Sequence, residues 1–120
     1  MVEGFKIQDS DAIRVTPEDL FLTTASMLRF AGLPDIDAKL AADVLVSADT
    51  RGVDSHGVSN MLSVYLDRFE DGTQETHPNW RIVRERPSTA NIDSDKGLCV
   101  VIAPKAMQIA IKKARATGLG

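Results

Sequence analysis

The sequence predicts an α/β (α+β) fold in which an N-terminal cluster of helices is followed by a β-hairpin and one long helix. Apolar residues recur at helical spacing in three segments before residue 72. After a polar stretch at residues 73–79, two short runs with β-branched side chains precede a further alanine-rich helical pattern. We therefore divide the chain into a helical region, residues 1–72, and the start of an α/β region, residues 73–120. We expect both to be part of a larger fold that is truncated here.

The first two helices are marked by their boundary residues. Thr16 is a predicted N-cap followed by Pro17 at the first helical position, and Gly32 ends the helix. A second helix is expected from Pro34 to about Arg51, with alanines that allow close packing. The predicted buried residues are Leu20, Phe21, Thr24, Met27, Leu28 and Ala31 in the first helix, and Ile36, Ala38, Leu40, Ala41, Ala42, Val44, Leu45 and Ala48 in the second.

A third helix is predicted from about Ser55 to Asp71, with Asp54 or Ser55 as its N-cap and Gly72 as its end. This assignment places His56 in the first turn, where unpaired backbone N–H groups and the positive end of the helix dipole lie. An imidazole, a hydroxyl and free amides at one point predict a receptor for a small anion, although an exposed histidine on a solvated face is the simpler interpretation. The apolar face is Val58, Met61, Leu62, Tyr65, Leu66 and Phe69, and the polar face is His56, Asn60, Ser63 and Asp67.

Two strands are predicted at residues 80–85 and 89–93, joined as a hairpin around residues 86–88, although their alternation of apolar and polar residues is irregular. A further short strand is expected at residues 13–15.

A long helix is predicted from about Leu98 to Thr117, ended by Gly118. Because proline disrupts helical hydrogen bonding, this helix should begin near Pro104 or bend there. The residues predicted to be mostly buried are Ala106, Met107, Ile109, Ala110, Ile111 and Ala114.

Composition limits the classes of partner. The formal net charge is −3 and the basic residues are scattered, so we expect no nucleic acid and no acidic membrane surface as partner. No apolar stretch approaches the roughly 20 residues that a membrane span requires. The single cysteine, Cys99, allows no internal disulfide and suits a cytoplasmic protein. Its apolar neighbours predict that this thiol is buried.

Spacing argues against several kinds of active site. Ser55 and His56 are adjacent on a helical turn and point about 100° apart, so we do not expect them to meet as a hydrolase pair. Asp54, His56 and His77 match no recurring ligand pattern, so we expect no metal. A Gly-x-Gly-x-x-Gly fingerprint is also missing from the sequence.

The central motif, Arg51-Gly52-Val53-Asp54-Ser55-His56-Gly57-Val58, resembles the signature of the malate/L-lactate dehydrogenase family. These are the type 2 NAD(P)-dependent 2-hydroxyacid dehydrogenases, which include ureidoglycolate and sulfolactate dehydrogenases. The similarity extends over nearly the whole chain, through residues 61–72, 84–98 and 103–118. The family has a nicotinamide-binding fold of its own, without the usual glycine fingerprint. The resemblance implies the N-terminal part of an oxidoreductase that transfers a hydride between NAD or NADP and a small 2-hydroxy or 2-oxo acid.

By the same resemblance, Ser55 and His56 lie in the substrate pocket, and Asn60 stands where family members commonly carry a substrate-binding arginine. Asparagine can hydrogen-bond but offers no charged, bidentate fork. The proton-transferring histidine of the family is expected beyond Gly120, so we expect no catalytic residue in this chain and no activity from its 120 residues alone. The resemblance also implies a homodimer, and it assigns no cofactor contact to these residues.

A second hypothesis comes from a different class of protein. The chain would then be a non-catalytic helical domain that binds another protein, and the polar stripe from His56 to Asp67 would be solvated surface. A reading frame that continues into a nicotinamide-binding domain would favour the dehydrogenase.

Overall fold

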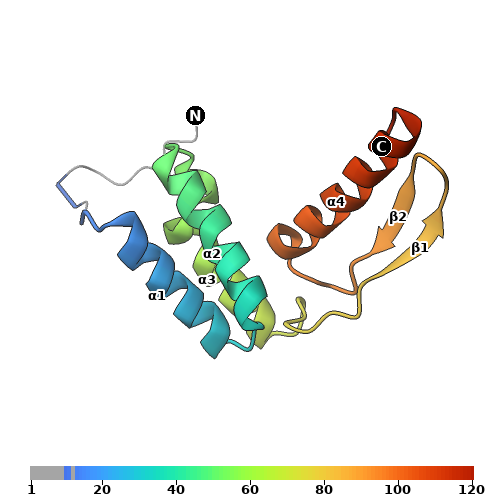
Figure 1. Cartoon of the computed structure of the whole chain (residues 1–120). Coiled ribbons are helices and arrows are strands. Elements are labelled where there is room, and N and C mark those ends of the chain that lie inside the picture. The colour runs from blue at the N-terminus through green and yellow to red at the C-terminus, as the bar shows by residue number, and fades with distance from the viewer. Residues whose placement is uncertain (1–9, 12) are drawn as a thin grey trace.

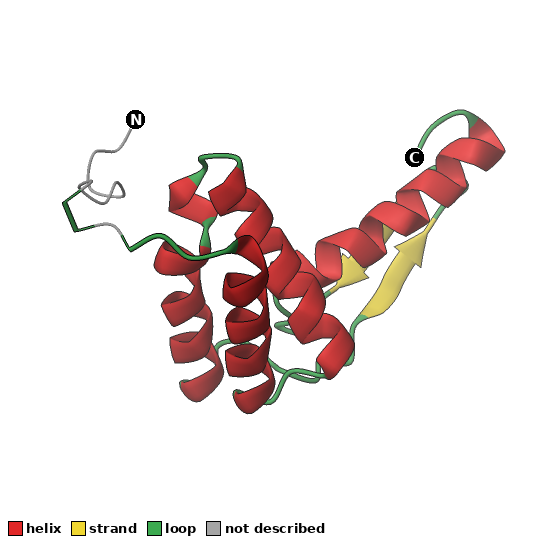
Figure 2. Ribbon diagram, turned by 60° about the vertical axis from the view of Figure 1, so that its left-hand side comes forward, coloured by secondary structure: helices red, strands yellow, loops and turns green. Residues whose placement is uncertain are grey.

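The computed structural model describes residues 10, 11 and 13–120, and it confirms a cluster of helices followed by a hairpin and one long helix. The helices α1, α2 and α3 lie side by side, while α4 and the hairpin β1–β2 extend from one side of this cluster (Figures 1 and 2). A short 3-10 turn, η2, joins α2 to α3. The bounds are α1 Pro17–Phe30, α2 Asp35–Thr50, η2 Asp54–His56, α3 Val58–Glu70, β1 Arg81–Glu85, β2 Ala90–Asp93 and α4 Cys99–Thr117.

The helix ends follow local chemistry. The Thr16 hydroxyl accepts a hydrogen bond from the Asp19 N–H at 3.1 Å, and Pro17 occupies the first position of α1. Gly118 ends α4 in the left-handed region, with φ of 84°. The strand predicted at residues 13–15 is wrong, because no described strand lies beside this segment to supply hydrogen bonds.

The core lies between α1, α2 and α3 and includes the first turn of α4. Ala38, Ala41 and Ala42 are fully buried, which confirms that the alanines of α2 allow close packing. Two residues of α1 and α2 that were predicted to be buried are exposed: Met27 at 42% and Ile36 at 80%. Ile36 lies about 200° around the helix from Ala38, on the opposite side of α2. The core cluster is Leu28, Leu33, Ala38, Ala41, Leu45, Leu62, Tyr65, Leu98 and Val101.

Only the start of α4 packs against the helical cluster. Leu98, Val101 and Ile102 are buried there, whereas Met107 is 58% exposed and Ile111 is 36% exposed, so the predicted buried face of this helix is wrong for those two residues. The rest of α4 extends along the hairpin, beyond the reach of the other helices (Figure 1). The helix begins before Pro104 and continues through it.

Cys99 is exposed, so the prediction of a buried thiol is wrong. It stands at the first position of α4, between Leu98, which is buried, and Val100, which is half-buried. Successive helical residues point about 100° apart, so apolar neighbours in sequence do not bury the residue between them. None of the helices in the described residues has the length and apolar character that a membrane crossing requires.

The strands β1 and β2 form an antiparallel hairpin with a register shift between Ile82 and Arg84. An extra residue on one strand reverses the side-chain alternation beyond it, which accounts for the irregular pattern in the sequence. Lys113 of α4 binds the hairpin. Its Nζ lies 2.9 Å from the Glu85 carboxylate and donates a hydrogen bond of 2.6 Å to the Arg86 carbonyl.

The joint between α2 and α3 differs from the prediction. The helix α3 begins at Val58 and not at Ser55, and Gly57 is its N-cap, with extended backbone and no side chain to cap with. The capping group comes instead from α2: the Asp49 carboxylate accepts a hydrogen bond from the Val58 N–H at 2.9 Å. Asp49 lies nine residues before the amide that it caps, so no local capping pattern predicts it.

This joint depends on the missing side chain at Gly57. A methyl group there would lie 1.6 Å from Asp49 Oδ1. We expect Gly57→Ala to lower the free energy of unfolding by about 1–3 kcal/mol, because the carboxylate or the backbone must move. Asp49→Ala removes the obstructing group, so the double variant should be more stable than the sum of the two single effects predicts. Urea unfolding of all four proteins measures this coupling, and strictly additive effects would contradict the geometry.

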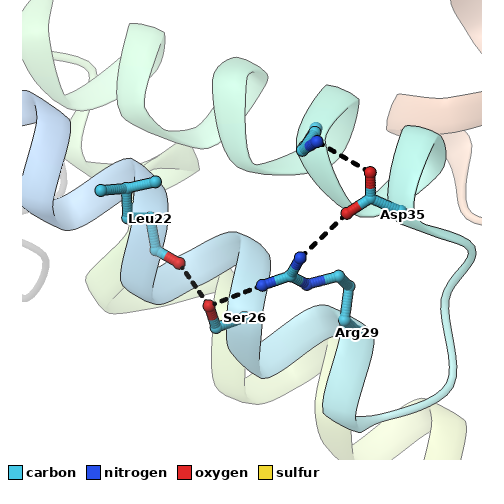
Figure 3. A network of polar contacts seen from close by, with 5 residues as sticks. Leu22, Ser26, Arg29 and Asp35 are labelled. Carbon is cyan, nitrogen blue, oxygen red and sulfur yellow. Dashed lines mark hydrogen bonds and ion pairs between the residues drawn. The ribbon is translucent and has the colours of Figure 1, made fainter.

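A polar network joins α1 to the first turn of α2 (Figure 3). The Asp35 carboxylate contacts Arg29 Nη1 at 3.0 Å and Lys39 Nζ at 2.8 Å. Arg29 Nη2 also donates to Ser26 Oγ, which in turn donates to the Leu22 carbonyl. The hydrogen bonds from Lys39 and then Arg29 hold the pKa of Asp35 below its usual range.

The lowered pKa of Asp35 gives its ion pairs a defined pH dependence. Their contribution is present above the unfolded-state pKa of about 3.9 and is lost as the pH falls through the lower folded-state value. We expect Asp35→Asn to destabilise the protein at neutral pH and to differ less from wild type below about pH 3. Because the pair is half exposed, the difference should be small and should shrink in salt. Urea unfolding against pH tests this, with Asp43→Asn on the exposed face of α2 as the control. An Asp35→Asn difference that does not vary with pH would refute it.

Candidate functional site

The first two predicted site residues lie in the turn η2, between the end of α2 and the start of α3. Ser55 Oγ is 2.9 Å from His56 Nδ1, so the expectation that these adjacent side chains would not meet is wrong. The residues stand in a 3-10 turn and not on an α-helix, and the serine hydroxyl needs to reach only the nearer ring nitrogen. His56 is exposed and Ser55 is half-buried, which leaves Nε2 as the nitrogen available to a ligand.

A hydroxyl beside an imidazole does not by itself identify a site in this chain. Thr76 Oγ1 lies 3.1 Å from His77 Nδ1 in the loop before β1, and this second pair has the same chemistry. His77 is exposed. What distinguishes the Ser55–His56 pair is its place at a helix junction fixed by further hydrogen bonds.

Asn60, the third predicted site residue, lies in the first turn of α3 and is bonded back to the same turn. Its Nδ2 donates to the Asp54 carbonyl at 2.8 Å, and Ser59 Oγ is a more distant acceptor at 3.4 Å. This bond brings Asn60 to the junction that carries Ser55 and His56. With one amide hydrogen committed to the backbone, Oδ1 and the remaining hydrogen are the groups that a ligand could use.

Asp49 is the residue of this junction that sequence reasoning missed. Its carboxylate accepts the hydrogen bond of the Val58 N–H. The sequence predicted free amides at the start of this helix, but the first amide of α3 is already bonded. The negative charge of this carboxylate also opposes an anion bound directly at the Val58 amide, which leaves the exposed side chains of the junction as the groups that could bind one. The sequence did contain a signal: an acidic residue in the last turn of α2 is unfavourable to that helix dipole, which suggests a partner elsewhere.

Within the described ranges, no three metal-binding side chains come together. Asp54 and His56 share the turn η2, whereas His77 lies in the loop before β1. The three residues considered as metal ligands therefore lie in two separate segments of the described chain.

Comparison with known proteins identifies related chains. Residues 15–120 match the family model for malate/L-lactate dehydrogenase. The chain is 46% identical over 112 residues to a malate dehydrogenase of Pyrococcus horikoshii, which covers 93% of this chain and 31% of that protein. It is 41% identical over 104 residues to an L-sulfolactate dehydrogenase of Methanocaldococcus jannaschii, covering 87% of this chain and 30% of the relative. An NAD(+) ureidoglycolate dehydrogenase of Escherichia coli is 32% identical over 107 residues, covering 89% and 30%.

Solved structures agree with these relationships. The Pyrococcus horikoshii malate dehydrogenase superposes with a TM-score of 0.88 at 45% identity, over 94% of this chain and 32% of that one. The Methanocaldococcus jannaschii sulfolactate dehydrogenase gives a TM-score of 0.82 at 40% identity, over 86% and 30%. The chain thus spans about 31% of the length of the relatives that it matches. Since the family model covers residues 15–120, this chain belongs to the malate/L-lactate dehydrogenase family.

Proposed function

We propose that this chain is part of an NAD(P)-dependent oxidoreductase that transfers a hydride between nicotinamide and a small 2-hydroxy or 2-oxo acid. The observation that carries the proposal is the family match across residues 15–120. The activity belongs to the whole protein, because the chain spans only 31% of the length of its relatives.

The names of the relatives narrow the class of substrate. Malate and sulfolactate are both 2-hydroxy acids that carry a second anionic group on the neighbouring carbon, and the relatives above 40% identity bear these names. We therefore favour a 2-hydroxy acid with two anionic groups as the substrate, or its 2-oxo counterpart.

We assign substrate binding to His56, Ser55 and Asn60. The His56 imidazole, exposed and oriented through its contact with Ser55, would donate from Nε2 to a substrate carboxylate. Asn60 would add one neutral hydrogen bond from the next turn, where an arginine would supply two charged ones. Binding at these groups would fix the orientation of the reacting carbon, which is how positioning residues contribute to rate.

The described residues do not fit a conventional nicotinamide site. Their one sheet is a two-stranded antiparallel hairpin, so it lacks the crevice at the ends of parallel strands where dinucleotides commonly bind. We propose that the groups which hold nicotinamide and move the proton lie outside these 120 residues, and we assign no catalytic residue within them.

We further propose that the whole protein is a homodimer and that it is located in the cytoplasm. The outer face of α1 exposes Leu22 at 54% and Phe30 at 97%, beside Leu66 of α3. Exposed apolar side chains gathered on one face are typical of surfaces that become covered on association. The single cysteine suits a reducing compartment.

The direct test is turnover by the full-length protein. We expect oxidation of malate or sulfolactate with NAD or NADP, and the reverse reaction with the 2-oxo acids, followed by the absorbance of reduced nicotinamide. Lactate and ureidoglycolate serve as comparisons with one anionic group. Absence of turnover with every acid and both cofactors would refute the proposed activity.

A second test concerns His56. We expect His56→Ala in the full-length enzyme to reduce kcat/KM by about 10²–10⁴-fold, as typical for a positioned polar group at the reacting substrate. The affinity for the cofactor and the melting temperature should be nearly unchanged, because His56 is exposed. His77→Ala is a matched control, since it removes an exposed imidazole with an equivalent hydroxyl partner. Equal kcat/KM values in the two variants would refute the assignment of His56 to the substrate site.

A further inference from the structure

We propose that Asp49 is a positioning residue for the substrate site, a role that rests on the proposed function of Ser55 and His56. Asp49 belongs to α2 and, among the described contacts, makes no hydrogen bond to either side chain. Its carboxylate instead binds the first amide of α3, where the turn that carries Ser55 and His56 ends. It would act through the backbone on the placement of His56.

Two consecutive residues of α2 hold the two sides of the turn. Before the turn, the Ala48 carbonyl accepts a hydrogen bond from the Val53 N–H at 2.9 Å. After the turn, Asp49 Oδ2 accepts one from the Val58 N–H, also at 2.9 Å. Because both acceptors belong to the last turn of one helix, the path of the intervening residues is set relative to α2.

The contact at Gly57 makes this arrangement specific. Gly57 is buried, and its backbone lies so close to Asp49 that a methyl group there would be 1.6 Å from Oδ1. The carboxylate therefore fills the volume beside the residue that directly follows His56. A capping group further from the turn would satisfy the same N–H group without restricting the backbone in this way.

The placement of Asp49 runs against the preference of its own helix. Carboxylates are unfavourable near a helix C-terminus and favourable near an N-terminus. Asp49 lies at the C-terminal end of α2, which has no basic residue in its last turn, and at the N-terminus of α3. The interaction that favours an acid at position 49 is therefore the one with α3 and with the turn before it.

The experiment compares Asp49→Ala, Asp49→Asn and Asp71→Ala in the full-length enzyme. Asp71 is a matched control at the other end of α3, where its carboxylate accepts a hydrogen bond from the Thr73 N–H at 2.8 Å. We expect Asp49→Ala to reduce kcat/KM by about 10- to 100-fold, mainly through the KM for the acid substrate, because a small displacement of a binding group is sufficient. Asp49→Asn should recover most of this loss, since its carbonyl oxygen can still accept from Val58. Asp71→Ala should lower the melting temperature without this kinetic effect.

Wild-type kcat/KM in Asp49→Ala, or an equal kinetic loss in Asp71→Ala, would overturn the positioning role. If the protein shows no dehydrogenase turnover, the proposed function is refuted but the effect of Asp49 on His56 is still open to test. NMR of the His56 ring then tests that effect, and His56→Gln serves to assign the signal. A shift of the His56 ring resonances in Asp49→Ala and not in Asp71→Ala supports the role. Unchanged resonances in Asp49→Ala overturn it.

Discussion

Every other helix of the described chain packs against α2, and this packing depends on side chains that are too small to keep the helices apart. Ala38, Ala41 and Ala42 are fully buried, and Leu28 of α1 and Leu45 of α2 fill the adjoining space. The same helix also contacts the turn η2, the helix α3 and the start of α4. Interiors packed at this density respond to single methylene groups, so the positions of α1, α3 and α4 depend on this one surface.

The central place of α2 also gives the candidate site its frame. Its last turn supplies the Ala48 carbonyl and the Asp49 carboxylate, which hold the two sides of the turn with Ser55 and His56. The exposed imidazole is thus attached through one short segment to the most buried of the described helices. Such a connection reconciles two requirements of a binding residue, which must be open to a ligand and yet fixed in position.

Asn60 combines a structural contact within the turn with a limited capacity to bind an anion. Its amide completes the turn through the Asp54 carbonyl, so the side chain has a structural contact here. An asparagine supplies at most a neutral hydrogen bond to a carboxylate, whereas an arginine supplies two parallel charged ones.

The sequence by itself determined what depends on a few neighbouring residues. The cap at Thr16, the end at Gly118, the apolar face of α3 and the hairpin were all predictable, because capping, left-handed backbone and periodicity act within one or two turns. The family, and with it the candidate residues Ser55 and His56, followed from a contiguous motif. Only the tertiary structure decided which apolar faces are covered: Met107 and Cys99 are exposed because the other helices reach no further than the buried face at the start of α4. It also decided where α3 begins, since the group that caps Val58 is the Asp49 carboxylate, brought there by the packing of α2 and by the missing side chain at Gly57.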